Sequence, residues 1–180
     1  MDIETTTHEV DCEGHTRSTS TKYIDHLLEY MTNLEGDVMV INEPGLIWNC
    51  VGLIESKAAD HHMEAIIATT EHSKAAGIVV ILGPQWRKVK TKVSTMDAKH
   101  KRLVNVEFKA KEKKRGQPLQ RLLLAAVYGL NGPESSHKNK HESGKLWETV
   151  IASVDEFRHE HPLGSVVVAG DFNAAKMSKL

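Results

Sequence analysis

Apolar residues recur along this chain in two patterns, one typical of strands and one typical of helices. Compact or alternating apolar runs predict strands at residues 37–42, 77–82, 102–109, 122–128 and 165–169, with residues 6–11 as a weaker candidate. Apolar positions three and four residues apart predict helices at residues 21–34, 58–70 and 145–160. The polar stretch 131–143 reads as a loop. Hairpins mixed with helices that cover sheets favour α+β or α/β layers.

Length and composition indicate one ordinary globular domain. The chain has 180 residues, of which 40% are hydrophobic and 26% are charged. No apolar run approaches the roughly 18 residues of a membrane span, and the polar N-terminus lacks the pattern of a secretory signal. We therefore expect an intracellular protein of the nucleus or cytoplasm, not secreted and without a membrane partner. Cys12 and Cys50 are read as two free thiols, since no CxxC pair is present.

Positive charge is concentrated in one segment. Residues 87–115 carry twelve Lys or Arg against three acidic residues, whereas the whole chain has a net charge of -1. Such a segment is a candidate contact for a polyanion, and the alternative is a solvated pair of strands with its loop. The candidate nucleic-acid-binding residues are Arg87, Lys88, Lys111, Lys113, Lys114 and Arg115.

The last predicted strand delivers candidate chemistry at its C-terminal end. Asp171 and Asn173 stand two residues apart, which places both side chains on the same side of an extended chain. A carboxylate and an amide there could orient a water molecule and hold a phosphate oxygen. The alternative is that Gly170 to Asn173 is simply a β-turn.

Two other strand ends carry polar side chains. Glu43 follows the apolar strand 37–42, where a carboxylate can supply an oxygen ligand to Mg²⁺. Tyr128 ends the strand 122–128, and its phenol could donate a hydrogen bond to a phosphate. A core tyrosine with its hydroxyl at the surface is the equally simple alternative.

The ordered motifs resemble those of a known group of proteins. In chain order they are DVMVINEPG, GIVVILGPQWR, RLVNVEF, LLLAAVYGLN, the pair LW at residues 146–147, and VVVAGDFNA. This set resembles the endonuclease/exonuclease/phosphatase superfamily, and most of all the apurinic-type endonuclease domains of non-LTR retrotransposons. The resemblance covers nearly the whole chain.

The resemblance implies an α+β fold, a two-layered β-sandwich flanked by helices, that hydrolyses phosphodiesters in DNA with Mg²⁺, for which Mn²⁺ can substitute. It assigns Glu43 to the metal, Tyr128 to a phosphate contact, Asp171 to the attacking water and Asn173 to transition-state stabilisation. Asp11 stands where the family has a metal-site Asn, and the added charge would alter that site. Asn49 lies in a similar WNxxG pattern but after Glu43, so it is read as a loop residue.

The family pattern also ends with strands and a Ser-Asp-His motif that residues 1–180 do not contain. We therefore expect a single domain that is incomplete at its C-terminus, weakly active or inactive, and prone to self-association through an uncovered sheet edge. Three functions stay open: a DNA endonuclease domain, a nucleic-acid-binding remnant, and a phosphatase or other phosphodiesterase of the same superfamily. A fourth reading is a remnant without any role.

Overall fold

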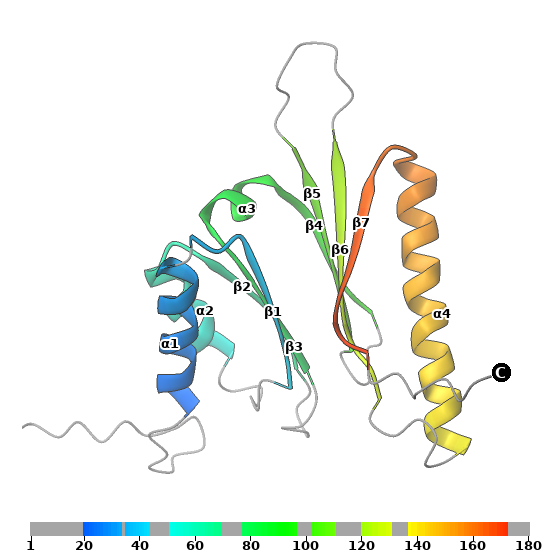
Figure 1. The fold of residues 1–180 in the computed structure, drawn as a ribbon, viewed down its shortest axis with the longest axis horizontal. Helices are drawn as coiled ribbons and strands as arrows, with labels where there is room; N and C mark the ends of the chain where they lie inside the picture. The colour runs from blue at the N-terminus through cyan, green and yellow to red at the C-terminus, as the bar shows by residue number, and fades with distance from the viewer. Residues whose placement is uncertain are drawn as a thin grey trace, which may run out of the picture.

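The computed structural model describes residues 20–33, 35–43, 51–69, 77–96, 102–110, 120–130 and 137–172. Within these ranges the chain forms helices and strands in mixed order (Figure 1). In chain order the elements are α1 (Ser20–Asn33), β1 (Val38–Asn42), α2 (Val51–Asp60), β2 (Glu64–Thr69), β3 (Gly77–Leu82), α3 (Pro84–Val89), β4 (Lys90–Met96), β5 (Leu103–Lys109), β6 (Arg121–Tyr128), α4 (His137–Glu160) and β7 (Ser165–Asp171).

The first sheet has three antiparallel strands in the order β1-β3-β2. Every residue of the central strand β3 is buried, which explains its continuous apolar sequence GIVVIL. β3 ends at Gly83 and Pro84, and the short helix α3 then leads the chain to the second sheet.

The second sheet has four strands in the order β4-β5-β6-β7. β4, β5 and β6 pair antiparallel, while β6 and β7 pair in parallel. A parallel pair needs a long crossover connection, which α4 supplies on the outer face of this sheet (Figure 1).

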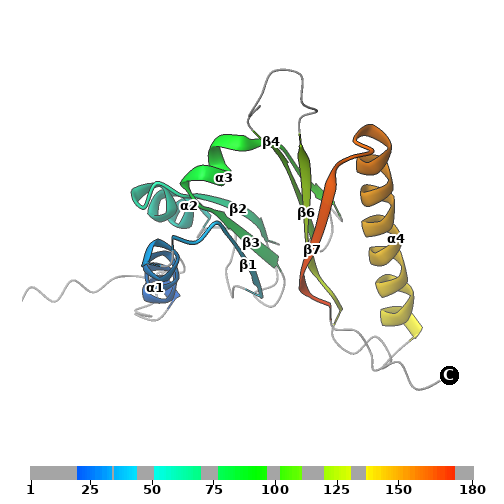
Figure 2. The ribbon, with the colours of Figure 1, turned by 45° about the horizontal axis from the view of Figure 1, so that its top comes forward.

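The two sheets pack face to face and form a sandwich with helices outside, as Figure 2 also shows. Alternate residues of β1, β2, β3, β5 and β6 enter the core between the sheets, including Val80, Val106 and Tyr128. The opposite face of the first sheet packs against α1 and α2, and that of the second sheet packs against α4. The expected α+β sandwich flanked by helices is therefore confirmed.

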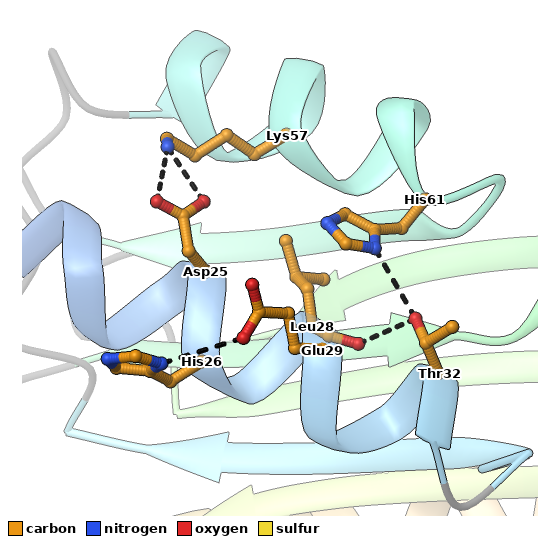
Figure 3. A network of polar contacts seen from close by, with 7 residues as sticks. All are labelled: Asp25, His26, Leu28, Glu29, Thr32, Lys57 and His61. Atoms are coloured by element: carbon orange, nitrogen blue, oxygen red, sulfur yellow. Dashed lines mark hydrogen bonds and ion pairs between the residues drawn. The ribbon is translucent and has the colours of Figure 1, made fainter.

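Polar contacts join α1 to α2 on the outer surface (Figure 3). Lys57 donates to both carboxylate oxygens of Asp25 at 2.7 Å, and Thr32 lies 3.3 Å from the ring of His61. These contacts link two helices that also share the buried residues Leu28 and Ile54.

Most predicted elements coincide with observed ones to within a residue or two. The helix predicted over 21–34 is α1, and the strands predicted at 37–42, 77–82, 102–109 and 122–128 are β1, β3, β5 and β6. The weak strand candidate at residues 6–11 lies outside the described residues, as do both cysteines.

The helix predicted over residues 58–70 is wrong. That stretch contains the end of α2, a turn with His62 at φ 60°, and the strand β2. Ala65 and Ile67 face the helices whereas Ile66 and Ala68 face the other sheet. A strand that lies between two apolar layers is buried on both faces. Its short apolar run therefore fits both the two-residue repeat of a strand and the 3.6-residue repeat of a helix.

One further expectation needs correction. Residues 137–143 belong to α4 rather than to a loop. The buried positions of this helix include Ser153, whereas Val154 is half-buried. Ser153 is accommodated because its hydroxyl donates to the carbonyl of Thr149 at 2.9 Å. β7 is mostly exposed and, among the described strands, pairs only with β6.

None of the helices in the described part of the chain combines the length and the apolar character that a membrane-spanning helix needs.

Candidate functional site

Three strand ends meet at one rim of the sandwich. β1 ends beside Glu43, β6 ends at Tyr128, and β7 ends at Asp171. Tyr128 and Asp171 are direct partners in the parallel register, so their side chains leave the sheet on the same face. The Tyr128 hydroxyl donates a hydrogen bond to Oε1 of Glu43 across the sandwich. The structure thus brings together three of the residues that the sequence singled out.

Glu43 has an unusual backbone conformation. Its φ is 49°, in the left-handed region that few residues other than glycine adopt. Its amide donates to the carbonyl of Gly77 at 3.2 Å, which attaches Glu43 to the first residue of β3. Glu43 is exposed as a residue, and its hydrogen bond from Tyr128 fixes one carboxylate oxygen. Backbone strain maintained at such a position is a common property of binding and catalytic sites.

Tyr128 is held in place by Arg102. It is buried to 1% exposure in the core between the sheets. The Arg102 guanidinium lies 4.6 Å from the ring centroid, and it also donates to the carbonyl of Gly129 at 3.0 Å. The amide of Tyr128 donates to the carbonyl of Arg102 at 2.9 Å. Arg102 therefore positions Tyr128, a role that the sequence analysis missed.

Asp171 owes its position to the glycine before it. Gly170 has φ 138°, and a Cβ there would lie 1.9 Å from the carbonyl oxygen of Val127. Only glycine permits this approach of β7 to β6, which aligns Asp171 with Tyr128. The carbonyl of Asp171 then accepts from the amide of Gly129 at 2.7 Å. The side chain of Asp171 is exposed at this rim.

Asn42 is a second residue that the sequence analysis missed. It is the last residue of β1 and alternates with Val38 and Val40, which face the second sheet. Its Oδ1 is buried without a hydrogen-bond partner among the described residues. A buried amide oxygen of this kind can accept from an ordered water or contact a cation. The only sequence signal was its place directly before Glu43.

The donor set at this rim fits a hard divalent cation. Mg²⁺ takes one or two carboxylates and completes its shell with water and substrate phosphates, so Glu43, Asp171 and the Asn42 oxygen are suitable in kind. Within the described residues no three His, Cys, Asp or Glu side chains gather closely enough to hold a metal by themselves. Asp11 and Asn173, the other two predicted site residues, lie outside the described residues.

The two described basic candidates do not share this rim. Arg87 and Lys88 are exposed on α3, which follows the end of β3 opposite the Glu43 end. Lys111, Lys113, Lys114 and Arg115 lie outside the described residues. Arg87 and Lys88 are separated from Glu43, Tyr128 and Asp171 by the length of the sandwich.

Comparison with known proteins identifies the fold. No family model and no curated protein matches this sequence. A solved structure of truncated Caenorhabditis elegans TDP2 is 13% identical with a TM-score of 0.56, over 96% of this chain and 62% of that one. ANGEL2, a 2′,3′-cyclic phosphatase solved with adenosine-2′,3′-vanadate, is 14% identical with a TM-score of 0.59, over 91% of this chain and 46% of that one.

The human Nocturnin catalytic domain, solved with a bound sulfate anion, is 12% identical with a TM-score of 0.54, over 89% of this chain and 59% of that one. The chain thus spans between 46% and 62% of the length of these three structures. All three belong to the endonuclease/exonuclease/phosphatase superfamily. The two sheets, their flanking helices and this likeness give the chain the fold of that superfamily.

Proposed function

We propose that this chain is a metal-dependent phosphodiesterase domain, a DNA endonuclease by default, with its reaction centre at the rim of Glu43, Tyr128 and Asp171. The observation that carries the proposal is the hydrogen bond from Tyr128 to Glu43, with Asp171 in register beside it. The resemblance of the motif sequences to those of non-LTR retrotransposon endonuclease domains supports an origin in such an element. The superfamily fold supports hydrolysis of phosphate esters more broadly.

In this proposal the three side chains have separate tasks. Glu43 would hold Mg²⁺, which would supply positive charge to the phosphate when bound. Asp171 accepts a hydrogen bond from a water molecule and orients its lone pair toward phosphorus. The phosphorus–oxygen bond to the leaving group then breaks as the new one forms, Asp171 takes the water proton, and the leaving oxygen takes a proton from solvent to become a hydroxyl.

Tyr128 positions Glu43 in the arrangement described above. A phenol has a single proton, and here Tyr128 donates it to the carboxylate. A direct contact to phosphate, as the family resemblance implies, therefore requires the Tyr128 hydroxyl to redirect its hydrogen bond from Glu43 to a phosphate oxygen when the substrate binds.

Nicking of supercoiled plasmid with Mg²⁺ or Mn²⁺ tests the proposal. We expect slow nicking by the unmodified chain, because Asp171 is exposed and an exposed carboxylate stabilises a transition state weakly. Glu43→Gln and Asp171→Asn should reduce even this rate by a further factor of about 100. Asp155→Asn, an exposed carboxylate on α4, serves as the matched control. Nicking that persists in both site variants contradicts the proposal.

A C-terminal segment bearing a Ser-Asp-His motif should increase the rate, because it would add charge stabilisation beside Asp171. Robust nicking without that segment, lost in Asp171→Asn, would mean that the three residues suffice. Adenosine 2′,3′-cyclic phosphate is the substrate for the phosphatase alternative, because ANGEL2 is described as a 2′,3′-cyclic phosphatase.

A nucleic-acid-binding module without cleavage is the second candidate, favoured by the exposed Arg87 and Lys88 on α3. Under this candidate the chain binds DNA with a steep salt dependence, and neither Glu43→Gln nor Asp171→Asn changes the affinity. Neutralising Lys111, Lys113, Lys114 and Arg115 together should weaken binding and flatten the salt dependence. An unchanged affinity and salt slope would exclude these four residues from the interface.

A further inference from the structure

A pocket lies at the rim opposite the proposed reaction centre. It has a volume of about 580 Å³, within the range of small-molecule sites. Its walls come from separate parts of the chain: Trp86 on α3, Phe108 at the end of β5, Arg121 and Leu122 at the start of β6, and Leu163 before β7. Leu122 and Tyr128 are six residues apart on β6, so the two rims are separated by roughly 20 Å.

The pocket combines aromatic surface with a small number of polar groups. Trp86 and Phe108 meet edge to face at 4.9 Å, with Trp86 only half-buried and so able to present part of its ring to a ligand. The side-chain amides of Gln85 and Gln120 and the guanidinium of Arg121 also line the space. An amide offers both a donor and an acceptor, and a guanidinium offers up to two parallel donors to a phosphate.

The charge around the pocket is positive. None of the described residues that line it is acidic, and Arg87 and Lys88 are exposed on the same helix as Trp86. A purely apolar ligand would make no use of Arg121, and a cationic ligand would be repelled by all three cations. The surroundings therefore favour an anion that carries a flat, partly apolar ring.

We propose that this pocket binds an unpaired nucleobase together with its phosphate, with the base against the half-buried ring of Trp86 and the phosphate at Arg121. Aromatic side chains are the usual surfaces on which unpaired bases stack, and arginine is a usual partner of the phosphate. The amides of Gln85 and Gln120 are placed to contact the base edge. The ligand is a free nucleotide or one residue of a single strand, since both present the same chemistry.

The proposal is independent of hydrolysis at the Glu43 rim, so each can fail without the other. An NMR titration of the full chain with adenosine monophosphate, and separately with a thymidine decanucleotide, tests it through the indole N–H signals of the three tryptophans. We expect the Trp86 signal to shift and the Trp147 signal to stay, because Trp147 packs elsewhere, 5.6 Å from Phe172. Tighter, salt-dependent binding of the decanucleotide identifies a strand as the source, and equal affinities identify a free nucleotide.

Arg121→Gln should weaken binding about fivefold or more, and Trp86→Leu should do the same. Arg158→Gln, an exposed arginine on α4, should leave the affinity unchanged. Circular dichroism confirms that each variant is folded. The proposal is overturned if neither nucleotide probe shifts the Trp86 signal, whether or not decanoate, an apolar carboxylate, shifts it. It is also overturned if Arg121→Gln binds the nucleotide probes with the same affinity as Arg158→Gln.

Discussion

At the scale of single residues, the rim depends on side chains whose neighbours the sequence does not reveal. Glu43, Tyr128 and Asp171 were identified from their places at strand ends, and their convergence follows from the sheet register. Arg102 was read only as the first residue of a strand, because nothing in a linear sequence says that it lies over Tyr128. Contacts across strands depend on the pairing register. A local sequence pattern specifies that register only when the turn between the strands can also be predicted.

Tyr128→Phe removes the hydroxyl that positions Glu43 and retains the buried ring. We expect the free energy of unfolding to fall by about 1 kcal/mol, the usual net value of one hydrogen bond, and any nicking rate to fall more than tenfold. Tyr30→Phe, at an exposed position of α1, is the control. Urea denaturation and plasmid nicking measure the two effects, and equal behaviour of both variants would contradict the assigned role.

Gly170→Ala places a methyl group against the carbonyl oxygen of Val127, at 1.9 Å in the unrelaxed structure. β7 must move away from β6, so we expect a loss of stability of at least about 2 kcal/mol. Gly144→Ala, within α4 and without any atom near its added methyl group, should instead stabilise by about 0.5–1 kcal/mol. Thermal unfolding gives both values, and shifts of the same sign would argue against the proposed β6–β7 approach.

At the scale of elements, local apolar patterns predicted most strands but failed where burial is two-sided. β3 was recognised because Gly and Pro end it, whereas β2 was taken for a helix because Met63, Ile66 and Ile67 also fit helical spacing. The first turns of α4 were missed because residues 137–143 are polar and carry no apolar stripe. The edge position of β7 likewise depends on neighbours rather than on its own apolar sequence.

The β4–β5 pair contains a charge contact that titrates. The Glu107 carboxylate raises the pKa of Lys92 by accepting its hydrogen bond and by its negative charge. Because the folded-state pKa is the higher one, the contact stabilises fully below the ordinary lysine value of 10.5 and is lost as the pH rises through the folded value. Lys92 is 55% exposed, so the effect is small.

Comparing the unfolding of the unmodified chain with that of Lys92→Gln between pH 9 and about pH 12 measures this contribution. We expect their difference in stability to shrink as the pH rises. A difference that stays constant across this range would exclude the Lys92 charge as its cause.

At the scale of the whole molecule, the second sheet has an accessible edge at β7. Val167 is 48% exposed and Val168 is 38% exposed. An uncovered apolar strand edge can pair with another chain, so we propose that the protein self-associates through β7. A lysine at such an edge blocks pairing, so Val167→Lys should shift the population toward monomer.

Analytical ultracentrifugation over a range of concentrations measures the association. Ile151→Lys is the control, since Ile151 is 58% exposed on α4 and belongs to no strand edge. A monomer at all concentrations, or an equal effect of both lysine variants, would contradict association through β7.

The position of β7 also has a consequence for the order in which structure is lost. Glu43 and Tyr128 are 85 residues apart in sequence, and α4 separates Tyr128 from Asp171, so the rim exists only after distant segments have met. In the described structure β7 pairs with β6 alone, and it can detach while the sheets remain packed. Its amides should therefore exchange with solvent at a lower free energy than those of β3. Denaturant should then separate Asp171 from Tyr128 before the sandwich unfolds.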